Sequence, residues 1–378
     1  MYPPRGAAVA VLVCLSGLNG AALPQRQDAR ASYAQALELQ RESNDAAALT
    51  LLWEAAALDP RDADIQNALG EALDRIGALD GAVAAYRASL DARPDFQKAA
   101  NNLILALAKS GRGEEAVERA RARVAEKPGD AERQFTLGLA QSEQDVTGAI
   151  ETFRRTLALA PRHVLARYNL ALTLSRVDRA GEAIEELRRA IQVESRPELH
   201  DALGVIYWHE GDLDRATAAL RDAIAANDRY ADAYDALGAV LTAKHDWTAA
   251  AAALGRAIAL RPERAESHSA LAHVLQMSGD ETGARREFER AEQLRRDRAR
   301  EREASALTAA AAQQFDRGEL TQALATLRNA TAVLNTYAPA FYQMGRTLQK
   351  LGREAEAGDA FARARQLNPS LALPRNTP

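Results

Sequence analysis

The sequence predicts an all-α protein, a right-handed α-solenoid (superhelix) of antiparallel helix pairs. First, prolines recur at intervals of about 34 residues or a near-multiple of it, at Pro60, Pro94, Pro128, Pro161, Pro262 and Pro369. Such a period is the signature of a repeat architecture. Second, the segments between the Gly and Pro residues are rich in Ala, Leu, Glu and Arg, which favour helix over strand. Third, the chain is 47% hydrophobic but only 5% aromatic, which suits many small contacts between neighbouring repeats.

Each repeat is expected to hold two helices and a turn. In the third repeat, Gln97 to Ser110 is one apolar-periodic stretch and Glu114 to Glu126 is a second, and Gly111 to Gly113 separate them. Gly ends the first helix because it tolerates a left-handed backbone, and Pro follows the second helix because it cannot continue one. The ten predicted repeats are 29–62, 63–96, 97–130, 131–163, 164–196, 197–230, 231–264, 265–298, 304–337 and 338–371.

Three positions repeat in register. Position 20 is alanine in all ten repeats: Ala48, Ala82, Ala116, Ala149, Ala183, Ala216, Ala250, Ala284, Ala323 and Ala357. Position 8 is small in nine of them: Ala36, Gly70, Gly138, Ala171, Gly204, Gly238, Ala272, Ala311 and Gly345. Small side chains let two helices approach closely, and a larger group would overpack them. Position 24 is often large and is expected to fill the space between helices: Leu52, Tyr86, Phe153, Leu187, Phe288 and Phe361.

These residues carry a resemblance to a known family. The sets Leu69-Gly70, Ala82, Tyr86, Pro94 and Met344-Gly345, Ala357, Phe361, Pro369 resemble the tetratricopeptide repeat signature. The resemblance covers residues 29–371. It implies a helical scaffold whose first helices line a concave face, with a protein or peptide as partner. It does not name that partner, because the family comprises scaffolds that bind very different proteins.

The chain is expected to divide at a seam late in the sequence. We expect one repeat block at 23–298, a helical seam at 299–303, a second block at 304–371 and a tail at 372–378. Gly and Pro are absent from Ala284 to Arg317, so the second helix of repeat 8 should run long, far enough to reach repeat 9. Solenoid ends usually need a polar cap. Too few residues follow repeat 10 to form one, so we expect the face of Ala357, Ala360 and Ala364 to be uncovered and open to self-association.

The N-terminal segment, 1–22, is predicted to be a signal peptide. Arg5 gives it one positive charge, Gly6 to Leu18 are apolar, and small residues lead up to an expected cleavage site after Ala22. We therefore expect a periplasmic or secreted protein with no membrane span after cleavage. The alternative is an uncleaved segment that anchors the chain to a membrane. Cys14 is the only cysteine, so the mature chain should have no thiol or disulfide.

Charge and motifs exclude several functions. The chain has 48 Lys and Arg against 52 Asp and Glu, a net charge of −4, whereas a nucleic-acid binder needs a basic face. The arginine-rich stretch from Arg285 to Arg302 is interleaved with acidic residues, which is typical of a solvated helix. No nucleophile elbow, phosphate loop or zinc-binding helix motif occurs, so we expect no enzyme activity, no catalytic residue, no metal and no cofactor.

The inner face of the first helices is the candidate binding surface. Positions 2, 5, 9 and 12 lie on one stripe of a helix. In repeats 4 to 6 this stripe includes an apolar strip of Phe135, Leu139, Tyr168, Leu172, Val205 and Trp208. Acidic residues of repeats 6 and 7 flank it: Asp201, Asp232 and Asp235. The strip either binds a partner, since an apolar patch outside a core is a candidate interface, or packs against the next repeat.

Two functions follow from these expectations. The first is an exported, non-enzymatic scaffold or adaptor that binds a polypeptide in the concave groove. The second is a structural or assembly factor of an envelope complex that acts through self-association.

Overall fold

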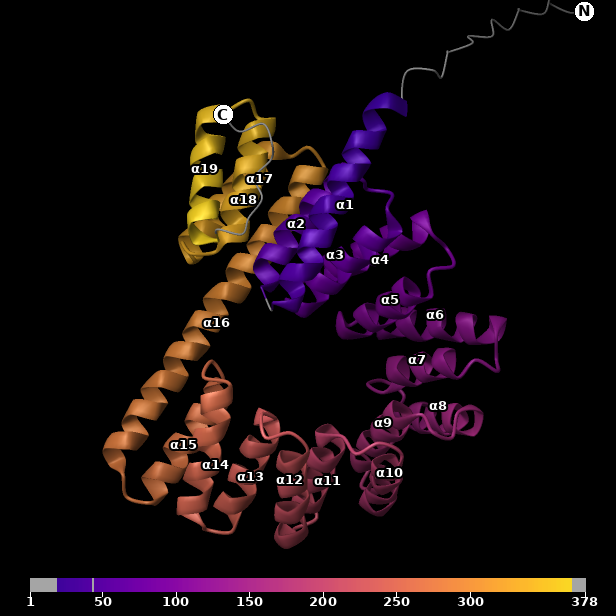
Figure 1. The fold of residues 1–378 in the computed structure, drawn as a ribbon, viewed down its shortest axis with the longest axis vertical. Helices are drawn as coiled ribbons and strands as arrows, with labels where there is room; N and C mark the ends of the chain where they lie inside the picture. The colour runs from indigo at the N-terminus through magenta and orange to yellow at the C-terminus, as the bar shows by residue number, and fades with distance from the viewer. Residues whose placement is uncertain (1–18, 43, 369–378) are drawn as a thin grey trace, which may run out of the picture. The chain divides into compact units, whose positions relative to one another are not determined.

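The computed structural model describes residues 19–42 and 44–368, and these form nineteen helices and no strand (Figure 1). The predicted signal peptide, Cys14 and the predicted tail lie wholly or largely outside the described residues. The helices are α1 (Asn19–Arg41), α2 (Asp45–Leu58), α3 (Ala63–Arg75), α4 (Leu79–Ala92), α5 (Gln97–Lys109), α6 (Gly113–Glu126), α7 (Ala131–Gln141), α8 (Val146–Leu159), α9 (Val164–Ser175), α10 (Ala180–Val193), α11 (Pro197–His209), α12 (Leu213–Ala226), α13 (Ala231–Ala243), α14 (Trp247–Leu260), α15 (Ala265–Met277), α16 (Glu281–Asp316), α17 (Leu320–Val333), α18 (Ala338–Lys350) and α19 (Glu354–Leu367).

The helices pack in the order that the repeat predicts. The second helix packs on the first helix of its own repeat, as in α3 with α4 and α11 with α12. It also packs on the first helix of the next repeat, as in α8 with α9 and α12 with α13. Each repeat thus buries its apolar stripe on its neighbours, and the predicted α-solenoid of helix pairs is confirmed.

In eight of the repeats, among the described residues, the turn between the two helices has one residue with a left-handed backbone, whereas the turn of repeat 4 has none. It is usually glycine, as at Gly211 with a φ of 77°, because glycine has no Cβ to clash. Asp178 takes this place in repeat 5 with a φ of 57°, and His245 takes it in repeat 7 with a φ of 61°. Aspartyl residues such as Asp212 then cap the following helix by accepting a hydrogen bond from a backbone N–H.

The small positions lie where two helices meet. All ten alanines of position 20 are at most 4% exposed. A Cβ built on Gly138 would lie 2.5 Å from Cε1 of Phe153, and one on Gly204 would lie 2.6 Å from Cγ of Leu220. The predicted pairing of a small position 8 with a large position 24 is therefore confirmed in repeats 4 and 6.

Phe288 departs from this pattern, and its expected role as a filler between helices is wrong. Its side chain is 42% exposed. In the other nine repeats the residue at position 24 is at most 1% exposed. Here α16 continues without a break as a 36-residue helix, which packs on α15 and then on α17. No separate helix of repeat 9 therefore begins beside Phe288.

The described chain forms two compact units, and the boundaries between them lie elsewhere than at the predicted seam. One unit takes the described residues up to 99 together with those from 338 onward, and the other takes residues 100–337. The residues 299–303 lie inside α16 and therefore within the second unit. The long helix itself agrees with the absence of Gly and Pro from this stretch.

The expected open face on the last helix is wrong. Ala357, Ala360 and Ala364 are only 1%, 6% and 0% exposed. They point inward because α19 packs along α18, where the rings of Tyr342 and Phe361 lie 5.7 Å apart. The first helix of the same repeat thus covers the small-residue face that was expected to be free for self-association.

The N-terminal end of the described chain is helical from Asn19. The expected cleavage point after Ala22 therefore falls within α1. Among the described residues, every helix is too short or too polar to cross a membrane.

Candidate functional site

The candidate groove lies in the second unit, on the first helices of repeats 4 to 7. These helices are α7, α9, α11 and α13. First helices contact each other directly from α9 onward, α9 with α11, α11 with α13, and α13 with α15, and α7 joins them through α8, which packs on both α7 and α9. They therefore form a continuous layer, on which positions 2, 5, 9 and 12 of each helix lie on a common side.

The predicted apolar strip is half-buried throughout. Side chains that pack partly against the buried core of this unit are Phe135, Leu139, Tyr168, Leu172 and Trp208. Val205 is also half-buried. Part of each side chain in the strip thus packs between repeats, as one of the two expectations requires. The rest of its surface lies outside the core, where the other expectation places a partner.

Aromatic rings mark the two ends of the strip. The ring of Phe135 lies 4.7 Å from that of His163 and 6.0 Å from that of Phe153. Trp208 stacks on His209 with ring centroids 5.5 Å apart. Beside Tyr168, at position 2 of α9, Leu165 is 47% exposed. An exposed leucine next to half-buried aromatic rings extends the apolar surface beyond the six residues that the sequence indicated.

The acidic flank contains its own counter-charges. Nη1 of Arg261 lies 3.0 Å from Oδ1 and Oδ2 of Asp232. Arg264 forms ion pairs with Asp232 and, at 2.9 Å, with Oδ2 of Asp235. Both arginines follow α14, and Arg264 directly precedes α15. They neutralise part of the charge that the sequence assigned to repeat 7.

Asp201 differs from the other two predicted carboxylates. Among the described residues, no Lys, Arg or His forms an ion pair with it, and its Oδ1 is buried without a hydrogen-bond partner. Burial raises the pKa of Asp201 from its ordinary value of 3.8 to about 6, and the nearby charge of Asp232 adds to the rise. Arg264 acts in the opposite direction. This carboxylate is therefore the least compensated charge on the groove.

Two tyrosines complete the surroundings of Asp201. Burial raises the pKa of Tyr168, and the negative charge of Asp201 contributes to the shift. The same two causes raise the pKa of Tyr230. Both hydroxyls thus stay protonated at neutral pH and lie near one carboxylate, which together form a polar end to the apolar strip.

Sequence reasoning missed Tyr230, Arg261 and Arg264. Tyr230 and Arg264 occupy position 34, the last residue before the next first helix. They are the N-cap residues of α13 and α15. A search that added position 34 to positions 2 and 5 would have found Tyr230 and Arg264, since a residue at the start of a helix lies beside its first turn.

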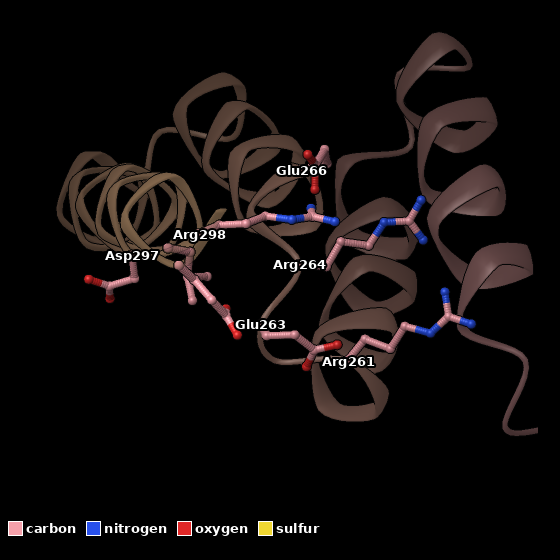
Figure 2. A pocket seen from close by; sticks show the side chains of 8 residues that line it. Arg261, Glu263, Arg264, Glu266, Asp297 and Arg298 are labelled. Carbon is pink, nitrogen blue, oxygen red and sulfur yellow. The ribbon is translucent and has the colours of Figure 1, made fainter. Parts of the chain in front are cut away.

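A cleft of about 690 Å³ adjoins the acidic flank (Figure 2). Apart from one leucine, the residues that line it are charged and of both signs: Arg261, Glu263, Arg264, Glu266, Leu294, Asp297, Arg298 and Glu301. Arg261 and Arg264 point away from α16, whereas Arg298 reaches from α16 toward the α14–α15 loop (Figure 2). This lining offers ion pairs and no nucleophile with an adjacent base.

The chemistry available to the groove is binding by shape and charge. In the described part of the chain, no group of three or more His, Cys, Asp or Glu side chains could hold a metal ion. The half-buried rings can anchor apolar side chains, and Asp201 can pair with a cation.

The fold and this surface define a helical-repeat scaffold for protein interaction. Sequence models described as "Tetratricopeptide repeat" match residues 22–96 and 139–199, and residues 197–230 and 338–371. Together they cover more than half of the chain, which belongs to the tetratricopeptide repeat family. That family is generally a non-enzymatic module for protein interaction. Comparison with curated proteins gives no match.

One solved structure supports the fold, and two others are similar over less than half of this chain. A tetratricopeptide repeat protein from Parabacteroides merdae is 18% identical, with a TM-score of 0.51, and the match covers 66% of this chain and 99% of that one. A thermophilic TPR protein of Thermus thermophilus is 22% identical, with a TM-score of 0.43 over 48% of this chain and 99% of its own. The protein MamA is 25% identical, with a TM-score of 0.40 over 43% and 96%.

Proposed function

We propose that the chain is a non-enzymatic scaffold that binds a polypeptide along the first helices of repeats 4 to 7. The observation that supports this best is the half-buried strip that ends at the least compensated carboxylate of the groove. Phe135, Tyr168 and Trp208 supply apolar surface, and Asp201 supplies charge beside it. Aromatic side chains in partly desolvated pockets carry much of the binding energy at interfaces.

The partner segment should combine apolar anchors with basic residues. Apolar side chains bury surface on the strip, and a lysine or arginine next to them pairs with Asp201. Asp232, in the flank beyond Asp201, attracts a basic residue of the partner less strongly than Asp201 does, because Arg261 and Arg264 already pair with Asp232. A segment in extended or helical form fits a layer of parallel first helices.

Selection of a displayed random peptide library on the full chain tests this function. We expect selected peptides to be rich in apolar residues with Lys or Arg nearby, and to bind less tightly at high salt. Trp208→Ala and Tyr168→Ala should each weaken these peptides by at least about 1 kcal/mol. Trp247→Ala is the matched control, since Trp247 begins the second helix α14 and lies outside the strip.

Two results would contradict the proposal. One is selection of peptides that bind wild type, Trp208→Ala and Tyr168→Ala equally well. The other is an equal loss from Trp247→Ala, because this would indicate a general loss of stability rather than a lost anchor.

We further propose that the scaffold acts outside the cytoplasm. The support is the apolar run from Gly6 to Leu18 after Arg5, together with the absence of cysteine after Cys14. Mass spectrometry of the protein from its native host should then find a mature N-terminus at Leu23. An intact N-terminus in a membrane fraction would favour the anchored form, and an intact N-terminus in the cytoplasm would contradict export.

A further inference from the structure

Helix α2 is buried on all sides over its middle turns, from Ala47 to Leu52. Its sequence from Ala46 to Leu58 contains a single charged residue, Glu54. The consecutive residues Leu49, Thr50, Leu51 and Leu52 are each at most 1% exposed. Neighbours in a helix are separated by about 100°, so four in a row face all sides. A helix that is apolar on all sides needs cover on all sides.

Thr50 shows that this burial is special to repeat 1. It occupies position 22, and it is 0% exposed. In repeats 2 to 10 every residue of position 22 is exposed: Ala84, Glu118, Glu151, Glu185, Ala218, Ala252, Arg286, Ala325 and Asp359. The side of the second helix that forms the surface elsewhere is therefore covered in repeat 1.

Helix α18 of repeat 10 packs on α2. The two helices belong to the same compact unit, although almost 300 residues separate them in the chain. Besides α18, the helices that pack on α2 within this unit are α1 of its own repeat and α3 of the next. The extra contact of α2 in this unit is thus with the last repeat.

Helix α18 is also buried at positions that are more exposed in other repeats. Pro339, at position 2 of repeat 10, is buried, whereas the residue at this position in repeats 2 to 9 is half-buried or exposed. Tyr342, at position 5, is 1% exposed. Burial raises the pKa of Tyr342, and the charge of Glu54 on α2 contributes to the shift. Glu54 and Tyr342 are therefore neighbours across the contact.

We propose that α2 and α18 form an intramolecular latch, in which the apolar helix of repeat 1 occupies the position-2 and position-5 side of repeat 10. The same positions form the candidate groove in repeats 4 to 7. In repeat 10 they are filled by a helix of the same chain, and a partner can reach them only after α2 leaves. The latch also gives each terminal repeat a cover, which solenoids usually obtain from a capping helix.

Amide hydrogen exchange on the full-length chain tests the latch. Thr50→Arg places a charge at a buried position, which is costly without a partner. Exchange in α18 should then become at least about tenfold faster, because α18 loses the helix that covers it. Ala84→Arg is the matched control, since Ala84 is the exposed residue at the same position of repeat 2. It should leave α18 unchanged.

A reciprocal variant on α18 distinguishes loss of the α2–α18 contact from a local defect in repeat 1. Pro339→Glu introduces on α18 the residue that Glu132 supplies at position 2 of repeat 4. It should raise exchange in α2 by a similar factor, whereas Leu165→Glu at the same position of repeat 5 should not. The latch is overturned if Thr50→Arg changes exchange only within repeats 1 and 2, or if Pro339→Glu leaves α2 protected.

Sedimentation of the same proteins identifies the occupant. The intramolecular latch predicts a wild type that stays monomeric at all concentrations at which α2 and α18 are protected. A wild-type dimer that dissociates in Thr50→Arg would show that α18 of a second copy covers α2, and would overturn the intramolecular form.

Discussion

Nη1 of Arg264 lies 2.9 Å from Oδ2 of Asp235, and the two residues come from opposite ends of repeat 7. Arg264 directly precedes α15, so it projects beside the first turn of that helix and reaches back to α13. The same guanidinium also pairs with Asp232. Of the three predicted acidic residues, Asp201 is therefore the one that remains available to a cationic partner.

Binding of a basic peptide should depend on the protonation of Asp201. The pKa of this carboxyl is raised to about 6, so it is charged at pH 7 and largely neutral at pH 5. The affinity for the peptide should fall about three- to tenfold from pH 7 to pH 5, because one partly buried ion pair is lost. Titration calorimetry with a selected peptide measures it. Asp201→Asn should remove the pH dependence, whereas Asp214→Asn, an exposed residue of α12 paired with Lys244, should keep it.

The same carboxyl should leave a signature in stability. Its pKa is higher in the folded chain, about 6, than the ordinary 3.8, so the folded state binds the proton more tightly. Wild type therefore loses stability relative to Asp201→Asn as the pH rises from about 4 to about 6. At pH 7 the variant should be more stable by about 3 kcal/mol, and below pH 4 the two proteins should be about equally stable. Urea unfolding at several pH values checks this, and a constant difference at all pH values would contradict it.

Ala216→Leu should overpack the helix pair of repeat 6. Ala216 is 0% exposed, and its backbone oxygen lies 3.3 Å from a Cβ built on Gly204 of the facing helix. The extra methyl groups should lower the free energy of unfolding by about 1–3 kcal/mol. Ala225→Leu is the control, because Ala225 is exposed on the same helix α12. Equal unfolding midpoints for the two variants would disprove the close contact.

His245→Gly should stabilise the turn of repeat 7. His245 has a φ of 61°, a conformation that costs a side chain about 1 kcal/mol and costs glycine nothing. Glycine also makes the unfolded chain more flexible, so the net gain should be somewhat smaller. His273→Gly is the matched control, and it should lower the free energy of unfolding. His273 lies exposed within α15, where glycine should weaken the helix by about 1 kcal/mol. A loss of stability in both variants would contradict the account of the turn.

The sequence predicted the repeat because the repeat depends on local chemistry. A left-handed turn requires Gly211 or a substitute, and a close helix crossing requires Ala216 with Gly204, and both constraints recur in most of the repeats. The stripe of Phe135, Tyr168 and Trp208 followed from helical spacing alone. What helical spacing cannot reveal is which part of a half-buried ring is covered, because that depends on how neighbouring helices are placed.

The sequence did not predict two contacts, because each joins residues that lie far apart in the chain. Arg264 reaches Asp232 across a loop, and α18 reaches α2 across almost the whole sequence. Neither follows from a periodic pattern, although the unusual apolarity of Leu49 to Leu52 was visible. The expected open face of Ala357 failed for a simpler reason, since the first helix of the same repeat covers that side.

The most direct test of the groove is a hydrogen-exchange footprint of a selected peptide on the full-length chain. The peptide should slow exchange in α7, α9, α11 and α13, the first helices that present the strip. The second helices α8, α10, α12 and α14 should exchange as they do in the free protein. Protection confined to the second helices, or to residues outside repeats 4 to 7, would contradict binding in the groove.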